Sequence, residues 1–176
     1  MSIENKRREV LFSKEQISSR VVELGAEIAE VYKEKNLLVV SLLKGSFIFT
    51  ADLVRAIDIP VRIEFMTTSS YGHSEESSGN VKVVQDLDVD LSGYDVLVVD
   101  DITDSGITMK AVLEHLGNKN PKSIKSCVLL DKPSRRKVEL EADYVGYTIP
   151  DKFIVGYGLN YGDYFRNIDH IFAFVD

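Results

Sequence analysis

Short apolar runs that alternate with helix-length segments constrain the fold of this chain more than any other feature. The run Leu37–Leu43 is too short for a helix and has almost no polar alternation, so it predicts a strand buried on both faces. Tyr94–Val99 and Ile124–Leu130 predict two more strands, and weaker candidates are Val61–Met66, Val81–Val84 and Tyr144–Ile149. Because strands alternate with helices, we expect an α/β domain with a mostly parallel central sheet flanked by helices.

Three segments between these runs have the features of helices. Ser13 and Gln16 have the spacing of a capping box, and the apolar residues behind them recur at steps of three and four, which predicts a helix over Lys14–Glu34. Ser46–Ile57 follows as a second helix. A third helix ends at Gly117, and its apolar face is formed by Met109, Val112, Leu113 and Leu116.

Length and composition fit one domain over residues 1–176. A chain of this length buries a full core unaided, and no linker or internal repeat divides it. The net charge of −7 argues against a nucleic-acid partner, since phosphate backbones are held by surplus Lys and Arg. The single cysteine, Cys127, is expected to be a small buried apolar residue. No secretory signal and no membrane-spanning run occur, so a cytoplasmic location is expected.

The segment Thr67–Asn80 differs from its surroundings because Ser, Gly and Glu dominate it. It has too little apolar surface to offset the entropy of ordering by burial, so we interpret it as a long mobile loop. Loops of this length within compact domains are usually lids or binding loops. The segment therefore predicts a lid over a ligand site.

The polar groups that suggest chemistry are concentrated in residues 96–109, VLVVDDITDSGITM. An apolar strand ends in two adjacent carboxylates, a short loop Ile102–Gly106 follows, and a helix begins. Ligands of open α/β sheets bind at the carboxyl ends of strands, where a helix N-terminus presents backbone N–H groups to an anion. Gly106 allows close approach of a phosphate. The polar side chains are Asp100, Asp101, Asp104, Ser105 and Thr108.

The adjacent carboxylates Asp100 and Asp101 would repel an anion that touched them directly. They suit hydroxyl groups or a hard cation instead, and Mg²⁺ prefers oxygen ligands. Both residues are therefore candidate ligands of Mg²⁺. The segment as a whole predicts a sugar phosphate with free hydroxyls as the ligand.

The acid–acid–x–x–acid–[Ser/Thr]–Gly–x–Thr pattern of residues 100–108 resembles the phosphoribosyl-pyrophosphate motif of type I phosphoribosyltransferases. Receiver domains also end a strand in two Asp residues, but they lack the adjoining phosphate nest. The resemblance implies the type I fold, with a small hood from the chain ends and a flexible lid loop. It implies that Asp104 faces N7 of a purine as general acid/base. It also implies that the motif binds substrate through Asp100, Asp101, Ile102, Thr103, Asp104, Ser105, Gly106, Ile107 and Thr108.

Four further segments resemble the hypoxanthine-guanine phosphoribosyltransferases in chain order, so the resemblance covers nearly the whole chain. The first, Ser41–Ser46, is similar to the pyrophosphate loop. It implies that Lys44 and Gly45 bind pyrophosphate and that the Leu43–Lys44 peptide bond is cis. The second, Thr67–Asn80, is similar to the flexible loop. There the resemblance implies that Ser70 and Tyr71 close over the site and exclude water.

The remaining two segments imply how the base is bound. Leu129–Ser134 is similar to the segment whose lysine, here Lys132, donates to the 6-oxo group of the purine; a lysine cannot accept from an amino group, so adenine is disfavoured. Ile149–Asn167 is similar to the base-binding segment. The resemblance places Lys152 in contact with substrate, Phe153 on the face of the purine, Ile154 at its edge and Arg166 on pyrophosphate.

Asn160 departs from the family pattern, in which most members carry Asp at this position. That Asp ligates a second Mg²⁺ on the pyrophosphate side. Asn keeps one carbonyl oxygen but brings no charge, so a second metal is expected to bind more weakly here, through water or with help from Asp163.

Together the motifs imply transfer of a 5-phosphoribosyl group from phosphoribosyl pyrophosphate to hypoxanthine or guanine, with Mg²⁺ as cofactor, by a homodimer or homotetramer. Two alternatives stay open. An enzyme of the same fold could use xanthine or a pyrimidine; Lys132 and Phe153–Ile154 argue against pyrimidines but say less about xanthine. A phosphoribosyltransferase-like RNA-binding regulator would need a basic face, whereas the basic clusters Lys6–Arg8 and Arg135–Lys137 are short.

Overall fold

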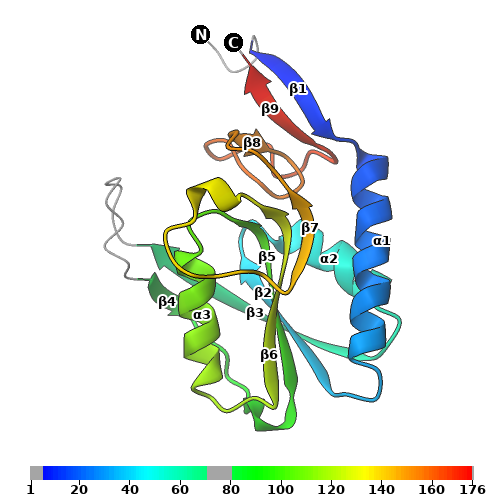
Figure 1. The fold of residues 1–176 in the computed structure, drawn as a ribbon, viewed down its shortest axis with the longest axis vertical. Coiled ribbons are helices and arrows are strands. Elements are labelled where there is room, and N and C mark those ends of the chain that lie inside the picture. Colours follow the sequence, from blue (N-terminus) through cyan, green and yellow to red (C-terminus); the bar gives the residue numbers. More distant parts are fainter. Residues whose placement is uncertain (1–5, 71–80, 176) are drawn as a thin grey trace.

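The computed structural model describes residues 6–70 and 81–175, which form two sheets and three helices (Figure 1). The larger sheet has the order β4-β3-β2-β5-β6-β7, and the smaller has the order β1-β9-β8. The helices are α1 (Lys14–Val31), α2 (Phe47–Ala56) and α3 (Ile107–Gly117). The strands are β1 (Arg7–Phe12), β2 (Leu37–Leu43), β3 (Val61–Ser70), β4 (Val81–Gln85), β5 (Asp95–Thr103), β6 (Ser123–Asp131), β7 (Tyr144–Thr148), β8 (Ile154–Val155) and β9 (Ile171–Val175). Single 3₁₀ turns lie at Leu91–Gly93 and Pro133–Arg135.

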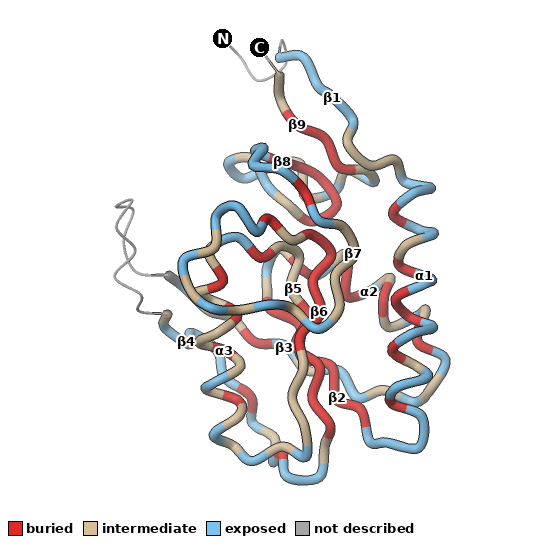
Figure 2. The backbone as a smooth tube through the Cα atoms, viewed as in Figure 1, coloured by how far each residue is buried: buried red, intermediate tan, exposed pale blue. Residues whose placement is uncertain are grey.

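The expected α/β architecture with a mostly parallel sheet is confirmed. All neighbouring pairs from β3 across to β7 are parallel, and only the edge strand β4 runs antiparallel to its neighbour. Strands β2, β5 and β6 occupy the centre and are buried along most of their length (Figure 2). Strands buried on both faces need apolar residues at successive positions, which explains why their sequences are continuous apolar runs.

The helices cover the two faces of this sheet unequally. On one face α1 and α2 pack over alternate strand residues, including Val39, Leu97 and Leu129. On the other face α3 packs over the intervening positions, including Val40, Val98 and Val128. Each central strand therefore contributes side chains to two separate apolar clusters. No helix among the described residues combines the length and apolar character that crossing a membrane requires.

The helix boundaries follow the sequence signals closely. The predicted capping box is present, with the Ser13 hydroxyl accepting from the Gln16 N–H (3.1 Å) and the Gln16 side chain accepting from the Ser13 N–H (2.8 Å). Helix α1 ends at Val31 rather than at Glu34 as predicted, because Glu34 adopts a left-handed backbone conformation (φ 62°) that stops the helix. Helix α2 fills the predicted span, with Ser46 and Ile57 as its caps.

Two predicted strand ends were wrong. Strand β3 continues through Thr67–Ser70, where a loop was expected, because these residues pair with β4 in an antiparallel ladder. Strand β5 continues past Val99 through Thr103, so Ile102 and Thr103 belong to the strand and not to the loop; their pairing with β6 extends to Thr103 opposite Asp131. The remainder of the predicted lid, including Tyr71, lies outside the described residues.

The smaller sheet joins the two ends of the chain and was not predicted as strands. Strand β1 pairs antiparallel with β9, and β9 pairs antiparallel with β8 (Figure 1). This sheet is the small hood that the family resemblance implies. It holds the segment between β8 and β9 over the carboxyl ends of the central strands, where the polar residues of the candidate site gather.

The crossing of α1 and α2 leads to a prediction about stability. A Cβ atom built on Gly25 of α1 would lie within about 2.6 Å of three atoms of Ala56 in α2. We expect Gly25→Ala to lower the free energy of unfolding by about 1 kcal/mol, since overpacking costs more than the helix gains from alanine. Gly117→Ala in α3 is the matched control, because a Cβ there meets no atom within 4 Å. Urea unfolding of both variants measures this, and equal stability would contradict the account.

Candidate active site

Three loops meet at the carboxyl edge of the central sheet. The Lys44–Gly45 turn follows β2, the loop Asp104–Gly106 follows β5, and Lys132 follows β6. Parallel neighbours end at the same edge, so residues far apart in the sequence become neighbours here. A pocket of about 280 Å³ lies against the middle loop, lined by Asp100, Ile102, Thr103, Asp104, Ser105, Gly106, Thr108 and Met109.

The loop after β5 has the geometry of an anion site. Gly106 adopts a left-handed conformation (φ 82°) and precedes the first residue of α3, so the free backbone N–H groups of the helix start face the loop. The Ile107 N–H is held by the Ser105 hydroxyl at 3.3 Å. A side chain at Gly106 would be strained by its φ and crowded by Arg136. The loop Asp104–Gly106, which is called the phosphate loop below after its predicted ligand, thus presents backbone N–H groups with hydroxyl groups beside them.

The paired carboxylates of Asp100 and Asp101 end the buried part of β5. Burial raises the pKa of Asp100 well above its ordinary value, and the neighbouring Asp101 charge raises it further. Burial also raises the pKa of Asp101, while hydrogen bonds from Asp100 and from the Ile102 N–H, and the charge of Arg166, oppose the rise. Two crowded carboxylates of this kind are stabilised by a cation or by hydroxyl donors, which fits Mg²⁺ or a ribose.

The turn after β2 lies directly against Asp101. Its Leu43–Lys44 peptide bond is cis, as the resemblance implied. A Cβ atom on Gly45 would overlap the Asp101 carboxylate, so glycine is required for this approach. The Lys44 side chain is exposed beside the turn. A buried hydroxyl network that the sequence did not predict fixes the turn: Ser41 bonds Ser46 (2.9 Å) and Thr50 (2.8 Å), and Ser46 donates to the Leu42 carbonyl.

Lys132 is the most constrained charged side chain of the site. It is only 6% exposed, and its ammonium group donates to the Lys152 carbonyl at 2.9 Å. Its Nζ also lies 3.5 Å from Asp104 Oδ1 and 3.9 Å from Asp151 Oδ1. A buried ammonium group needs such partners to offset its desolvation. Lys132 therefore joins the end of β6 to the phosphate loop and to the segment before β8.

The segment from Lys152 to Arg166 forms the wall opposite the sheet. Phe153 is 62% exposed with its ring edge against Tyr161, whereas Ile154 is buried in β8. The Lys152 side chain turns away toward Glu9 (3.3 Å), so its backbone carbonyl is what reaches the site. Arg166 donates to the Gly158 carbonyl at 2.6 Å, and its charge acts on Asp101.

Asn160 lies in an exposed turn in which its amide group donates to the Gly162 carbonyl at 2.7 Å. Within the residues that the structure describes, no group of three or more His, Cys, Asp or Glu side chains is placed to hold a metal ion. The protein offers the Asp100–Asp101 pair, so most ligands of a bound Mg²⁺ would come from the substrate and from water, as is usual for this ion.

Arg136 is a member of the site that the sequence reasoning missed. Its guanidinium group bonds the Asp104 carbonyl (2.8 Å) and pairs with Asp131 (2.5 Å), and both charged side chains are about 15% exposed. Asp131 ends β6, so the pair fixes the phosphate loop to that strand. The only signal was the basic cluster Arg135–Lys137, which composition alone assigns to the surface.

The fold and the three loops at the carboxyl edge of the sheet define a class of protein, and comparison with known proteins identifies the same class. Residues 9–162 match the phosphoribosyl transferase domain family, and the chain belongs to that family. The hypoxanthine-guanine phosphoribosyltransferase of Aquifex aeolicus is 51% identical over 99% of this chain and 98% of its own length. The hypoxanthine phosphoribosyltransferase of Haemophilus influenzae is 49% identical over 93% of each chain. A hypoxanthine phosphoribosyltransferase structure from Staphylococcus aureus has a TM-score of 0.94 at 41% identity and covers 99% of this chain and 95% of its own. The type I fold expected from the sequence is thereby confirmed.

The Arg136–Asp131 pair yields a prediction about the phosphate loop. We expect Arg136→Met to lower the free energy of unfolding by about 2 kcal/mol, because it leaves a largely buried carboxylate unpaired and removes the donor to Asp104. The neighbouring Arg135→Met, at an exposed pair, should cost under about 0.5 kcal/mol. In a double-mutant cycle with Asp131→Asn, measured by urea unfolding, the two losses should not add; simple additivity would show that the pair is not coupled.

Proposed function

We propose that this chain is a cytoplasmic purine salvage enzyme that transfers the 5-phosphoribosyl group from phosphoribosyl pyrophosphate to hypoxanthine, and to guanine, giving IMP or GMP and pyrophosphate. The observation that carries the proposal is the contact of buried Lys132 with Asp104, which joins a base-side lysine to a phosphate loop. The names of the family members reported above support the same reaction.

The sugar phosphate is proposed to lie along the loop after β5. The 5′-phosphate accepts hydrogen bonds from the backbone N–H groups of Asp104–Thr108 and from the Ser105 and Thr108 hydroxyls. Helix N-termini bind phosphate because their N–H groups are unpaired and carry partial positive charge. Ile102, Thr103 and Ile107 contribute through the backbone around this loop.

Asp100 and Asp101 are proposed to face the ribose hydroxyls and the first Mg²⁺. When Mg²⁺ is bound, its charge offsets the negative charge on the departing pyrophosphate. Lys44, the Gly45 backbone and Arg166 bind the pyrophosphate from the other side. The contact of Gly45 with Asp101 brings these two groups of residues together.

The purine is proposed to stack on Phe153, whose ring is exposed and which follows Lys152, the residue whose carbonyl holds Lys132. The backbone of Ile154 and the Lys152 segment meet the base edge, and Lys132 donates to the 6-oxo group. Asp104, half exposed in the loop, exchanges a proton with N7 as the glycosidic bond forms or breaks. Ser70, at the end of β3, and Tyr71 belong to the proposed lid.

The enzyme is further proposed to be a homodimer or homotetramer. Phe47, Ile63 and Phe65 are 38–48% exposed, and Ile63 and Phe65 lie on the sheet face that also carries α2. Exposed apolar side chains grouped on one face suit a subunit contact. Sedimentation analysis of the purified protein tests this proposal, and a monomer would refute it.

A panel of four bases tests the proposed reaction. With phosphoribosyl pyrophosphate and Mg²⁺, hypoxanthine and guanine should be converted and adenine rejected, since Lys132 cannot accept from an amino group. Xanthine is the informative fourth base, because preferred use of xanthine would support the main alternative. The proposal would be overturned if none of the four bases were converted.

The role of Lys132 is tested by Lys132→Ala. An unpaired purine acceptor costs about 1–3 kcal/mol, so kcat/KM for hypoxanthine should fall by about 5- to 150-fold while affinity for phosphoribosyl pyrophosphate changes little. Lys125→Ala, on the same strand but away from its carboxyl end, serves as the control. Equal loss for both substrates would show that Lys132 acts on the phosphate loop rather than on the base.

The role of Asn160 is tested by its Mg²⁺ dependence. We expect Asn160→Asp to saturate with Mg²⁺ at a lower concentration than the unaltered chain, because a carboxylate adds ligand charge. Asp163→Asn should shift the curve in the opposite direction if Asp163 assists the second ion. Superimposable titrations of turnover against free Mg²⁺ would show that position 160 does not influence the metal.

A further inference from the structure

We propose that Asp52 and Tyr157 are a pair of positioning residues that holds the two halves of the pyrophosphate side of the site together. Asp52 lies outside the motifs of the sequence, and Tyr157 lies within Ile149–Asn167 without an assigned role there. The inference rests on the proposed function, because it assigns the pair an effect on phosphoribosyl pyrophosphate and none on the purine.

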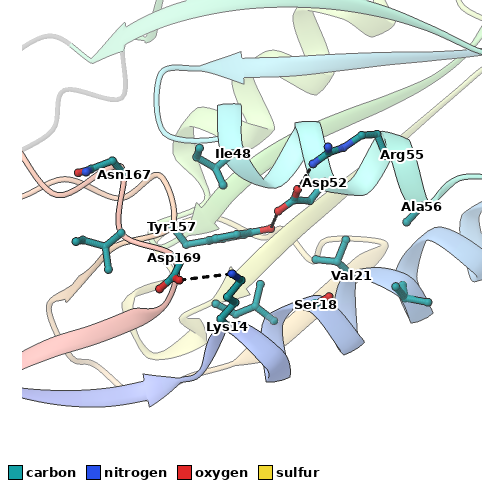
Figure 3. A pocket seen from close by; sticks show the side chains of 13 residues that line it. Lys14, Ser18, Val21, Ile48, Asp52, Arg55, Ala56, Tyr157, Asn167 and Asp169 are labelled. Atoms are coloured by element: carbon teal, nitrogen blue, oxygen red, sulfur yellow. Dashed lines mark hydrogen bonds and ion pairs between the residues drawn. The ribbon is translucent and has the colours of Figure 1, made fainter.

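The pair is a single short hydrogen bond between two elements distant in sequence. The Tyr157 hydroxyl donates to Asp52 Oδ2 at 2.5 Å, and the other carboxylate oxygen is held by Arg55 of the same helix (Figure 3). The Tyr157 residue is 6% exposed. Hydrogen bonds to charged acceptors are the stronger ones in proteins. The bond therefore ties the loop that carries Tyr157 to α2.

Each partner is attached to one half of the proposed pyrophosphate site. Asp52 lies on α2, which begins two residues after Gly45. Tyr157 precedes Gly158, whose carbonyl accepts from the Arg166 side chain (2.6 Å) and whose N–H donates to the Arg166 carbonyl (2.9 Å). Asn160 follows two residues later. A movement of Tyr157 would thus displace Arg166 and Asn160 relative to the Lys44–Gly45 turn.

The two halves come close together at Gly158. Gly158 has φ 101°, and a Cβ atom built there would overlap the carbonyl oxygen of Gly45. Because a Cβ atom does not fit between Gly158 and Gly45, no side chain at position 158 can absorb a shift of one turn against the other. The spacing of the two turns therefore depends on other contacts. The Asp52–Tyr157 bond is one of these, because it joins α2 to the loop that carries Tyr157.

The backbone of Tyr157 needs such an anchor. Its φ of 51° is in the left-handed region, which non-glycine residues rarely adopt unless the surrounding structure holds them there. The Tyr157 N–H is fixed by the Ile168 carbonyl at 2.8 Å, and the hydroxyl is the second fixed point. Between them the ring is buried in the apolar cluster under α1 and α2, and it borders a pocket of about 590 Å³ shared with Lys14, Asp169 and Ile48 (Figure 3).

The purine side is held independently. Ile154 is positioned by the pairing of β8 with β9, and Lys132 is fixed by the Lys152 carbonyl. None of these contacts passes through Asp52 or Tyr157. Loss of the Asp52–Tyr157 bond should therefore raise KM for phosphoribosyl pyrophosphate and leave KM for hypoxanthine nearly unchanged. A contact that only stabilises the fold would not distinguish between the two substrates.

The test uses Tyr157→Phe in the full-length enzyme, with Tyr147→Phe as the matched control. The Tyr147 hydroxyl also donates one long-range bond, to the Gln16 carbonyl at 2.8 Å, but at the far side of α1. Tyr157→Phe should raise KM for phosphoribosyl pyrophosphate about tenfold and change KM for hypoxanthine by less than about twofold, as expected for loss of a bond to a charged acceptor. Tyr147→Phe should leave both KM values unchanged.

Three further variants keep the result interpretable. Asp52→Asn retains an acceptor for the tyrosine hydroxyl and should recover most of the affinity that Asp52→Ala loses. Asp52→Ala combined with Tyr157→Phe should be no worse than either alone. Equal shifts in both KM values, additive effects, or a lowered melting temperature with unchanged KM would overturn the assignment. Failure of the unaltered chain to form nucleotide would instead refute the proposed function.

Discussion

The parallel pairing of β2, β5 and β6 is the constraint on which the rest of the structure depends. Pairing aligns Ser41 with Val99 and Thr103 with Asp131, so the three strands end at one edge. The loops that follow them are separated by tens of residues in sequence, yet they share one site. Burial of the strands on both faces fixes this register, since a shift of one residue would exchange the two apolar clusters.

At that edge, charge is arranged in two zones with different partners. Asp100 and Asp101 are crowded by burial and by each other, so they favour a cation or hydroxyls. Lys132 is buried beside Asp104 and is satisfied by a backbone carbonyl. The glycines at positions 45 and 158 let backbone approach where a side chain would collide. Together these features place the proposed phosphate, metal and base positions within one small region.

The sequence predicted the elements whose signals are local. The buried strand Leu37–Leu43, the capping box at Ser13 and the positions of the three helices follow from apolar spacing and local hydrogen bonds. The extension of β3 through Ser70 was missed because β4, and not composition, orders those polar residues. The pairing of β1 with β9 was also missed, because it depends on a partner strand at the other end of the chain and not on local composition.

Most residues that hold the candidate site together could not be predicted from the sequence. Arg136 bonds the Asp104 carbonyl from 32 residues away, and Asp52 bonds Tyr157 from 105 residues away, and no spacing rule predicts such contacts. The residues proposed to meet substrate were found through motif resemblance, since their chemistry requires particular residue types in a particular loop. The supporting residues need only a hydrogen-bond or ion-pair partner, and that partner is known only once the fold has brought the two residues together.

The proton transfer proposed for Asp104 is the claim that the account depends on most directly. Single-turnover rates of nucleotide formation, measured with saturating phosphoribosyl pyrophosphate and hypoxanthine for the unaltered enzyme and for Asp104→Asn, isolate the chemical step. Asn preserves size and hydrogen bonding but cannot exchange the proton, so the account predicts a rate lower by about 10²- to 10⁴-fold with little change in the affinity for either substrate. An unchanged single-turnover rate would contradict it.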